Sequence, residues 1–161
     1  MNVEANEDKM EVTVSVNGET YRRTIEPRML LADFLRIELG LSGTHIGCEH
    51  GKCGACTILF DGEPIRSCLM FAAQIDGHDL TTIEGIAESP EQLHPVQQAF
   101  IDNHALQCGF CTPGMIITSH AFLEENDNPS ESEIRRALSG NICRCTGYTN
   151  IVKAVSDAAQ R

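Results

Sequence analysis

The sequence predicts an α+β protein in which a small mixed β-sheet crossed by one helix precedes a domain made of helices. Three observations predict this order. Apolar and polar residues alternate in the first half, apolar residues recur at helical spacing in the second half, and glycine-centred turns give way to helix caps. We place a flexible N-terminal segment at residues 1–9, the first domain at 10–85, a linker at 86–91 and the helical domain at 92–161.

Two β-hairpins and one further strand account for the expected sheet. The stretch MEVTVSVNGETYRRTIE alternates about Asn17-Gly18, a dipeptide typical of tight hairpin turns, so we expect strands near residues 10–16 and 19–25. The stretch CTILFDGEPIRSC forms a second hairpin about Asp61-Gly62. DLTTIEG, residues 79–85, supplies the further strand.

Helices are expected at one place in the first domain and at four in the second. Residues 29–39 carry leucines at helical spacing and end before Gly40, a suitable helix C-cap. Proline at 113 suits a first helical turn, and Ser130 with Glu133 forms a capping-box pattern. The helices of the second domain are expected near residues 92–104, 113–126, 131–139 and 147–159.

Composition and charge narrow the function classes. The 161 residues are 42% hydrophobic, which is enough to bury a core. The formal charge of −11 repels phosphate backbones and anionic lipid surfaces, so we expect no nucleic-acid partner. The opening MNVEANEDKM is unlike a secretory signal, and apolar runs such as LMFAA are far shorter than the ~20 residues of a spanning helix. We therefore expect a cytoplasmic protein without direct membrane insertion.

Cysteine usage is the most informative feature of the chain. Disulfides, zinc and iron–sulfur clusters are the competing explanations for it. Disulfides need an oxidising compartment and usually serve chains too small to build a core, so they are disfavoured here. The eight cysteines fall into two groups of four, a first quartet and a second quartet: Cys48, Cys53, Cys56 and Cys68, then Cys108, Cys111, Cys143 and Cys145.

The first quartet matches an iron–sulfur pattern. Its spacing, C-x4-C-x2-C-x11-C, begins like the loop that binds a [2Fe–2S] cluster in plant-type ferredoxins. Zinc sites usually use two short hooks, whereas here three cysteines share one loop and the fourth is expected from a strand. Gly47, Gly51 and Gly54 let this loop turn tightly and bring N–H groups to the sulfurs. Because no second histidine completes a Rieske pair, we interpret His50 as a polar loop residue. We interpret His45 as a structural or solvated residue and not as a ligand.

The second quartet is expected at helix ends. Cys108 and Cys111 precede the second helix of the domain, while Cys143 and Cys145 lie between its last two helices. If the chain there runs extended, the thiols of Cys143 and Cys145 point the same way and could hold one iron, with Arg144 on the opposite face. Cys108 and Cys111 would then hold the other iron. This spacing also fits zinc, so both metals stay open.

Three motifs carry a family resemblance. GCEHGKCGACTI, QCGFCTPGMI and GNICRCTGY, in this order, closely resemble the iron–sulfur subunit of the xanthine oxidase family of molybdenum hydroxylases. That family includes carbon monoxide dehydrogenases and aldehyde, xanthine and N-heterocycle oxidoreductases. The resemblance runs from about residue 10 to the C-terminus. It implies a β-grasp, plant-type ferredoxin-like domain followed by a four-helix [2Fe–2S]-binding domain.

The resemblance implies an electron-transfer subunit of an oxidoreductase, with no catalytic residue or substrate site of its own. In the family, a large subunit holds molybdenum on a pterin, in bacteria often molybdopterin cytosine dinucleotide, and a medium subunit holds FAD. Electrons pass singly through two [2Fe–2S] clusters to FAD. By this mapping the second quartet binds the cluster beside the pterin, and the first quartet binds the one nearer FAD. A dimer of heterotrimers is the implied assembly, and this chain does not name the substrate.

Two residues carry over toward the pterin cofactor. Gln107 matches a glutamine that hydrogen-bonds the pterin, and Cys145 matches the cysteine that links the cluster to it. Without the resemblance, Gln107 is a surface amide at a helix end. Arg144 is open to three interpretations: it raises the cluster potential, contacts the molybdenum subunit or is solvated. A free-standing ferredoxin-like carrier and a zinc-stabilised interaction module are the alternatives for the whole chain.

Overall fold

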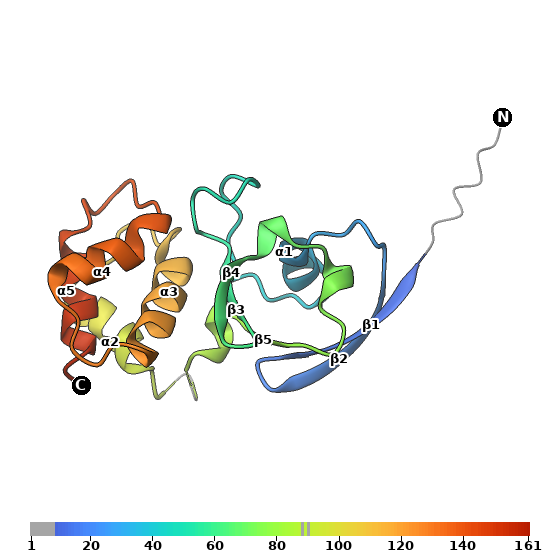
Figure 1. Cartoon of the computed structure of the whole chain (residues 1–161), viewed down its shortest axis with the longest axis horizontal. Coiled ribbons are helices and arrows are strands. Elements are labelled where there is room, and N and C mark those ends of the chain that lie inside the picture. The colour runs from blue at the N-terminus through green and yellow to red at the C-terminus, as the bar shows by residue number, and fades with distance from the viewer. Residues whose placement is uncertain (1–8, 88, 90) are drawn as a thin grey trace.

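The computed structural model describes residues 9–87, 89 and 91–161. Residues 1–8 of the expected flexible segment, and residues 88 and 90 of the expected linker, lie outside the described part. The chain forms two lobes, a sheet with one short helix and a group of helices, as Figure 1 shows. Helix α3 (Thr112–Glu124) packs against the sheet at β3 (Thr57–Phe60), which brings the two lobes into direct contact.

The described strands form one mixed sheet. Their order is β2-β1-β5-β3-β4. β1 pairs antiparallel with β2 and parallel with β5, while β3 pairs antiparallel with both β4 and β5. Alternate residues of β1 face the core, which is why its valines are buried and the residues between them are more exposed. The remaining strands are β1 (Met10–Val16), β2 (Glu19–Ile25), β4 (Glu63–Arg66) and β5 (Asp79–Thr81).

Both predicted hairpins are confirmed. Their turns have two residues each, and both residues adopt positive φ: 54° and 80° at Asn17 and Gly18, and 50° and 87° at Asp61 and Gly62. This backbone suits the twist of the flanking strands, so the turn residues set the register of each hairpin. The predicted strand at 79–85 is shorter than expected, because a 3₁₀ turn begins at Ile83.

The helix expected at residues 29–39 is only partly correct. α1 (Leu31–Asp33) is a short α-helical segment that continues as a π-helical turn over Phe34–Glu38. In that turn the N–H of Leu39 bonds to the carbonyl of Phe34, five residues back, and Gly40 closes the element with φ +71°. Apolar periodicity indicates which residues face the core, but it does not resolve this difference in hydrogen-bond register.

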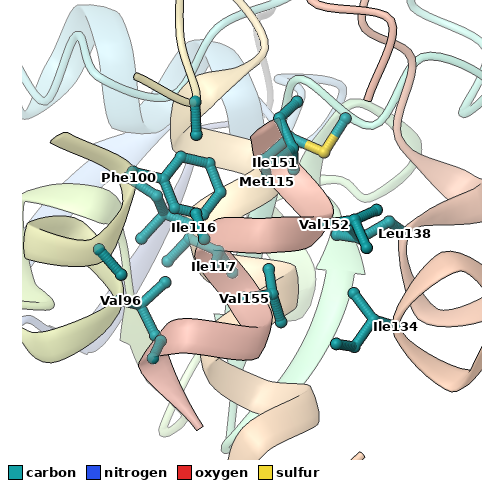
Figure 2. Packing of buried hydrophobic residues seen from close by; sticks show 14 of the residues in the cluster. Val96, Phe100, Met115, Ile116, Ile117, Ile134, Leu138, Ile151, Val152 and Val155 are labelled. Carbon is teal, nitrogen blue, oxygen red and sulfur yellow. The ribbon is translucent and has the colours of Figure 1, made fainter. Parts of the chain in front are cut away.

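The helical lobe has its own hydrophobic core. Figure 2 shows Phe100 of α2, Met115 of α3 and Ile151 of α5 among the side chains that meet there. Ser130 and Glu133 form the predicted capping box at the start of α4. None of the helices in the described part of the chain has the length and apolar character that a membrane span requires. Besides α3, the helices are α2 (Pro95–Asp102), α4 (Glu131–Ala137), which continues as a 3₁₀ turn over Leu138–Gly140, and α5 (Thr149–Ala158).

Two of these helices begin later than the sequence predicts. α2 begins at Pro95 because His94 caps it: His94 Nδ1 accepts the N–H of Val96 at 3.3 Å, and Gln97 bonds back to the His94 N–H at 3.0 Å. α5 begins at Thr149 because Tyr148 has φ +68°, outside the helical region.

Candidate metal centres

The first quartet is assembled by one loop and one short turn. Cys48, Cys53 and Cys56 lie on the loop that leads into β3. The expectation that Cys68 arrives from a strand is wrong, because β4 ends at Arg66, two residues earlier, and Cys68 lies on a 3₁₀ turn over Ser67–Leu69. The N–H and the hydroxyl of Ser67 both bond to the carbonyl of Cys56, at 3.2 and 2.8 Å. These bonds bend the chain out of the strand and bring Cys68 to Cys56.

Within the first quartet the thiols meet in two pairs. The thiol of Cys48 contacts that of Cys53, and Cys48 Sγ also accepts the Cys53 backbone N–H at 3.4 Å. The thiol of Cys56 contacts that of Cys68, and both are buried beside Ala32. One pair is therefore half-exposed and the other lies inside the lobe.

Glycines keep the space beside these thiols free of side chains. A Cβ on Gly47 would lie 3.1 Å from Cys53 Sγ and 3.2 Å from the ring of Phe110. Gly51 adopts φ +78°, and a Cβ there would lie 2.5 Å from Leu69 Cδ1. The loop can therefore wrap closely around a bound group only because these positions lack a side chain.

The environment shifts the thiol pKa values of the first quartet in opposite directions. Hydrogen bonds from the backbone N–H groups of His50 and Cys53 lower the pKa of Cys48 to about 6. Burial, reinforced by the neighbouring Cys56 thiol, raises the pKa of Cys68 to about 11. Burial also raises the pKa of Cys53. Cys48 is thus ready to bind metal as a thiolate, whereas Cys68 requires the positive charge of the metal to lose its proton.

The second quartet also forms two thiol pairs, but they differ from the predicted pairs. Cys108 Sγ lies 3.4 Å from Cys145 Sγ, and the thiol of Cys111 contacts that of Cys143. The expected pairing of Cys143 with Cys145, and of Cys108 with Cys111, is therefore wrong.

Local hydrogen bonds explain this difference. The chain from Cys143 to Cys145 is not extended: Cys143 is buried, and Cys145 lies beyond a bend and is exposed. Cys143 Sγ lies 3.1 Å from Thr146 Oγ1 and accepts the Thr146 N–H at 3.5 Å. Its own N–H donates to the hydroxyl of Tyr148 at 2.9 Å. These contacts turn the Cys143 thiol inward, away from Cys145.

Burial and hydrogen bonding also separate the pKa values of the second quartet. Burial raises the pKa of Cys111 to about 12. Burial also acts to raise the pKa of Cys143, but hydrogen bonds outweigh it, those from the hydroxyl and N–H of Thr146 first, so this pKa lies below its ordinary value. The backbone N–H of Phe110 lowers the pKa of the exposed Cys108.

This donor arrangement fits a dinuclear iron–sulfur cluster at each quartet. Four thiols form two pairs in both places, N–H groups point at sulfur, and a [2Fe–2S] cluster takes two cysteines on each iron. Over residues 9–87, 89 and 91–161, no three His, Cys, Asp or Glu side chains are arranged to hold a single metal ion. A mononuclear zinc site would require all four thiols to converge on one point.

The two quartets are joined by main-chain contact between the lobes. The N–H of Ile142 donates to the carbonyl of Cys53 at 2.9 Å, which links a residue of the first quartet to the neighbour of Cys143. His45 stacks on Phe110 with ring centroids 4.9 Å apart, and its Nδ1 lies 2.8 Å from the Phe110 carbonyl. His45 is therefore a structural residue, as predicted.

The second quartet opens to the surface. Cys108 and Cys145 are exposed, and so are Gln107 and Arg144 beside them. The Gln107 side chain makes no hydrogen bond to any other described residue. Phe110 and Ile142 nearby are 47% and 55% exposed, an unusual share for large apolar side chains.

Sequence reasoning missed four residues that shape these sites. Arg66 and Asn141 connect the two cysteine loops, while Thr146 and Tyr148 orient Cys143. Asn141 and Tyr148 flank the cysteines of GNICRCTGY, but their residue types alone do not indicate such contacts. Arg66 is distant in sequence from the residues it bonds, so the sequence carries no local signal for it.

The fold and the two thiol sites define a two-domain [2Fe–2S] protein, and comparison with known proteins agrees. Residues 14–81 match the family described as 2Fe-2S iron-sulfur cluster binding domain, and residues 82–156 match the family described as [2Fe-2S] binding domain. The chain belongs to the iron–sulfur subunits of the xanthine oxidase family of molybdenum hydroxylases. It is an electron-transfer subunit of an oxidoreductase complex.

Three relatives carry this assignment. The chain is 53% identical over 151 residues to caffeine dehydrogenase subunit gamma from Pseudomonas sp. (strain CBB1), with 92% of this chain and 90% of the relative covered. It is 51% identical over 148 residues to the beta subunit of the 6-hydroxypseudooxynicotine dehydrogenase complex from Paenarthrobacter nicotinovorans, covering 91% and 92%. In the crystal structure of quinoline 2-oxidoreductase from Pseudomonas putida 86, one chain matches with a TM-score of 0.92 at 49% identity, covering 94% of both chains.

Proposed function

We propose that this chain passes electrons singly from a molybdenum–pterin centre on a large partner subunit, through two [2Fe–2S] clusters, to FAD on a medium partner subunit. The cysteines of the second quartet hold the cluster beside the pterin, and those of the first quartet hold the cluster nearer FAD. One observation carries the proposal: two sets of paired thiols lie on loops that the Ile142–Cys53 hydrogen bond joins directly. The domains are 10–85 and 92–161, the second a four-helix cluster-binding domain, with the linker at 86–91.

The protein holds the clusters and shapes the surroundings in which electrons move. A [2Fe–2S] cluster supplies one-electron acceptance and donation, with a potential set by hydrogen bonds to sulfur, charge and exposure. The N–H groups of Cys53 and Thr146 donate to cysteine sulfurs and thereby stabilise negative charge on them. The buried thiols of Cys56, Cys68 and Cys143 would keep water from part of each cluster, while the exposed thiols of Cys108 and Cys145 give a partner access.

Gln107 and Cys145 are the proposed contacts to the pterin, which we expect as molybdopterin cytosine dinucleotide. Both are exposed on the surface around the second quartet, and the unengaged Gln107 amide offers two donors and an acceptor. The exposed Phe110 and Ile142 give the same surface the apolar area that subunit interfaces use. This surface is where the large subunit is proposed to bind.

The wider assembly is proposed as a cytoplasmic dimer of heterotrimers. Relatives are named as subunits of dehydrogenases, which supports partner chains. Their names refer to caffeine and 6-hydroxypseudooxynicotine, and a structural neighbour is named for quinoline. An N-heterocycle is therefore the first substrate class to assay on the purified complex.

Metal analysis tests the central proposal. The protein is purified from its source with the subunits that accompany it, and iron, acid-labile sulfide and zinc are measured. We expect equal iron and sulfide, a brown colour and two distinct cluster signals in electron paramagnetic resonance (EPR) spectra after reduction. A colourless sample that contains zinc without iron would contradict the iron–sulfur assignment. Purification as a lone monomer would favour a free-standing carrier instead.

Gln107→Ala tests the pterin contact. Loss of this contact is expected to lower turnover of the complex about tenfold, by analogy with outer-shell partners of metal sites, while both cluster signals persist. Pterin content, measured by fluorescence after extraction, is expected to fall as well. Gln160→Ala, at another exposed glutamine far along the chain, is the matched control. Unchanged turnover and pterin content in Gln107→Ala would remove this residue from the site.

A further inference from the structure

A buried asparagine lies between the two lobes. Asn141 is only 2% exposed, and both ends of its side-chain amide are hydrogen-bonded. Nδ2 donates to the carbonyl of Gly54 at 3.1 Å, while Oδ1 accepts from Thr118 Oγ1 at 3.1 Å and from Arg66 at 3.4 Å. The partners belong to the first cysteine loop, to α3 and to β4, so one side chain connects all three.

Arg66 adds a second connection from the sheet lobe. Its guanidinium donates to the carbonyl of Gly140 at 2.8 Å and to Thr57 Oγ1 at 2.7 Å, in addition to Asn141. Thr57 Oγ1 in turn donates to the Gly54 carbonyl at 2.6 Å. The same carbonyl is thus held from both lobes, and we name the pair of side chains Arg66 and Asn141 the interlobe clamp.

The interlobe clamp acts on the main chain that carries the cysteines. Gly54 lies between Cys53 and Cys56, and Gly140 and Asn141 lead directly to Cys143. A Cβ on Gly54 would lie 2.6 Å from the carbonyl oxygen of Gly140, so the two loops touch backbone to backbone. A shift of either loop therefore changes the separation of the two quartets.

We propose that Arg66 and Asn141 are positioning residues that fix the separation and relative orientation of the two clusters, and with them the rate of electron transfer between clusters. The inference rests on the proposed function, because it requires that each quartet holds a cluster. Neither side chain hydrogen-bonds a cysteine sulfur in the described part of the chain. Their loss therefore acts on geometry between the sites and leaves the ligands of each cluster in place.

The side-chain types of the interlobe clamp favour a role in positioning the loops over a role in simply holding the lobes together. A buried amide contributes little to stability unless all its hydrogen bonds are made, and an apolar side chain would join the lobes with less desolvation. Directional bonds from an amide and a planar guanidinium fix orientation as well as distance. Lysine keeps the charge of Arg66 but has no rigid fork of donors, so Arg66→Lys separates geometry from charge.

The test uses the complete complex with Asn141→Ala, Arg66→Lys or Arg66→Ala in this chain. Two reduced, paramagnetic clusters interact magnetically in a way that depends on distance and orientation, which EPR detects as splitting or faster relaxation. We expect unchanged iron and sulfide, both cluster signals, an altered or lost splitting, and slower electron transfer between the two clusters. Asn150→Ala and Arg135→Lys are the matched controls, since these side chains bond within the helical lobe alone.

The outcomes separate this inference from the proposed function. If the unaltered complex lacks two iron–sulfur signals, the proposed function fails, and the inference fails with it. If all variants keep both clusters with the splitting of the unaltered complex, only the inference is overturned. If Asn141→Ala loses a cluster, the Arg66→Lys variant decides whether the inference stands, because lysine keeps the charge and most of the packing of Arg66. An unchanged splitting in Arg66→Lys, together with an unchanged rate of transfer between clusters, then overturns the inference.

Discussion

Gly114 offers the sharpest test of how the lobes are packed. It lies in the first turn of α3, where alanine normally stabilises a helix relative to glycine by about 1 kcal/mol. A Cβ at this position would, however, lie 2.2 Å from the carbonyl oxygen of Gly54 and 3.2 Å from Asn141 Nδ2. The near neighbour is backbone of the first cysteine loop, so no side-chain rotation relieves the contact.

The magnitude follows from these opposing effects. Overpacking costs about 1–3 kcal/mol, and separating Asn141 from Gly54 leaves buried polar groups unpaired at a further cost of about 1–3 kcal/mol. Subtracting the helix gain of about 1 kcal/mol leaves Gly114→Ala destabilised by about 3 kcal/mol. For a chain of this size that lowers the melting temperature by about 6–12 °C.

Thermal unfolding measures this difference directly. Circular dichroism and cluster absorbance are followed anaerobically at one scan rate for the complex with Gly114→Ala and with Gly43→Ala. The control also introduces close contacts, at 2.4 Å with Ile83 Cγ2 and 2.8 Å with Glu84 Oε1, but both are with side chains and not with backbone. Gly43→Ala is expected to lose clearly less stability. A Gly114→Ala variant as stable as the unaltered protein would refute the close-approach argument.

Three further predictions concern individual cysteines and their support. Tyr148→Phe leaves the Cys143 N–H without its hydrogen-bond partner. This is expected to destabilise the protein by about 1 kcal/mol and to shift only the EPR signal of the second quartet. An unchanged spectrum would contradict this expectation. Cys143→Ser is expected to halve the iron content and to remove one EPR signal, and loss of both signals would count against separate sites. In cluster-free protein, Cys48 has a pKa of about 6 and is therefore a thiolate above that pH. Its rate of alkylation by iodoacetamide, measured by mass spectrometry, is expected to rise between about pH 5 and 7 and then to level off. Cys111, with its pKa of about 12, is expected to react last across this range, and equal rates at pH 7 would argue against these environments.

Much of the fold could be predicted because its signals are local. Asn17-Gly18 and Asp61-Gly62 define two-residue turns through their own backbone preferences, and the structure has both hairpins where expected. The capping box at Ser130 depends on atoms three residues apart, so it too could be read directly. The π-helical end of α1 could not, since α- and π-turns bury the same apolar residues.

The candidate sites likewise include features that the sequence predicted and features that it did not. Cysteine spacing alone picked out both quartets, because three ligands of the first share one loop and the second lies at helix ends. The thiol partners within the second quartet were predicted wrongly, since they depend on Thr146 and Tyr148 turning Cys143 inward. Cys68 was placed on a strand because nothing in the sequence reveals that Ser67 bonds back to Cys56.

The sequence by itself determined that this chain carries two groups of four thiols in two domains, and three motifs placed it in its family. Only the tertiary structure decided how the thiols pair and how the two loops meet. Asn141 and Gly54 are 87 positions apart, yet their bond, with those of Arg66, holds the loops together. These hydrogen bonds form only when the lobes pack. Their partners are far apart in the sequence and come within bonding distance only once α3 lies against the sheet.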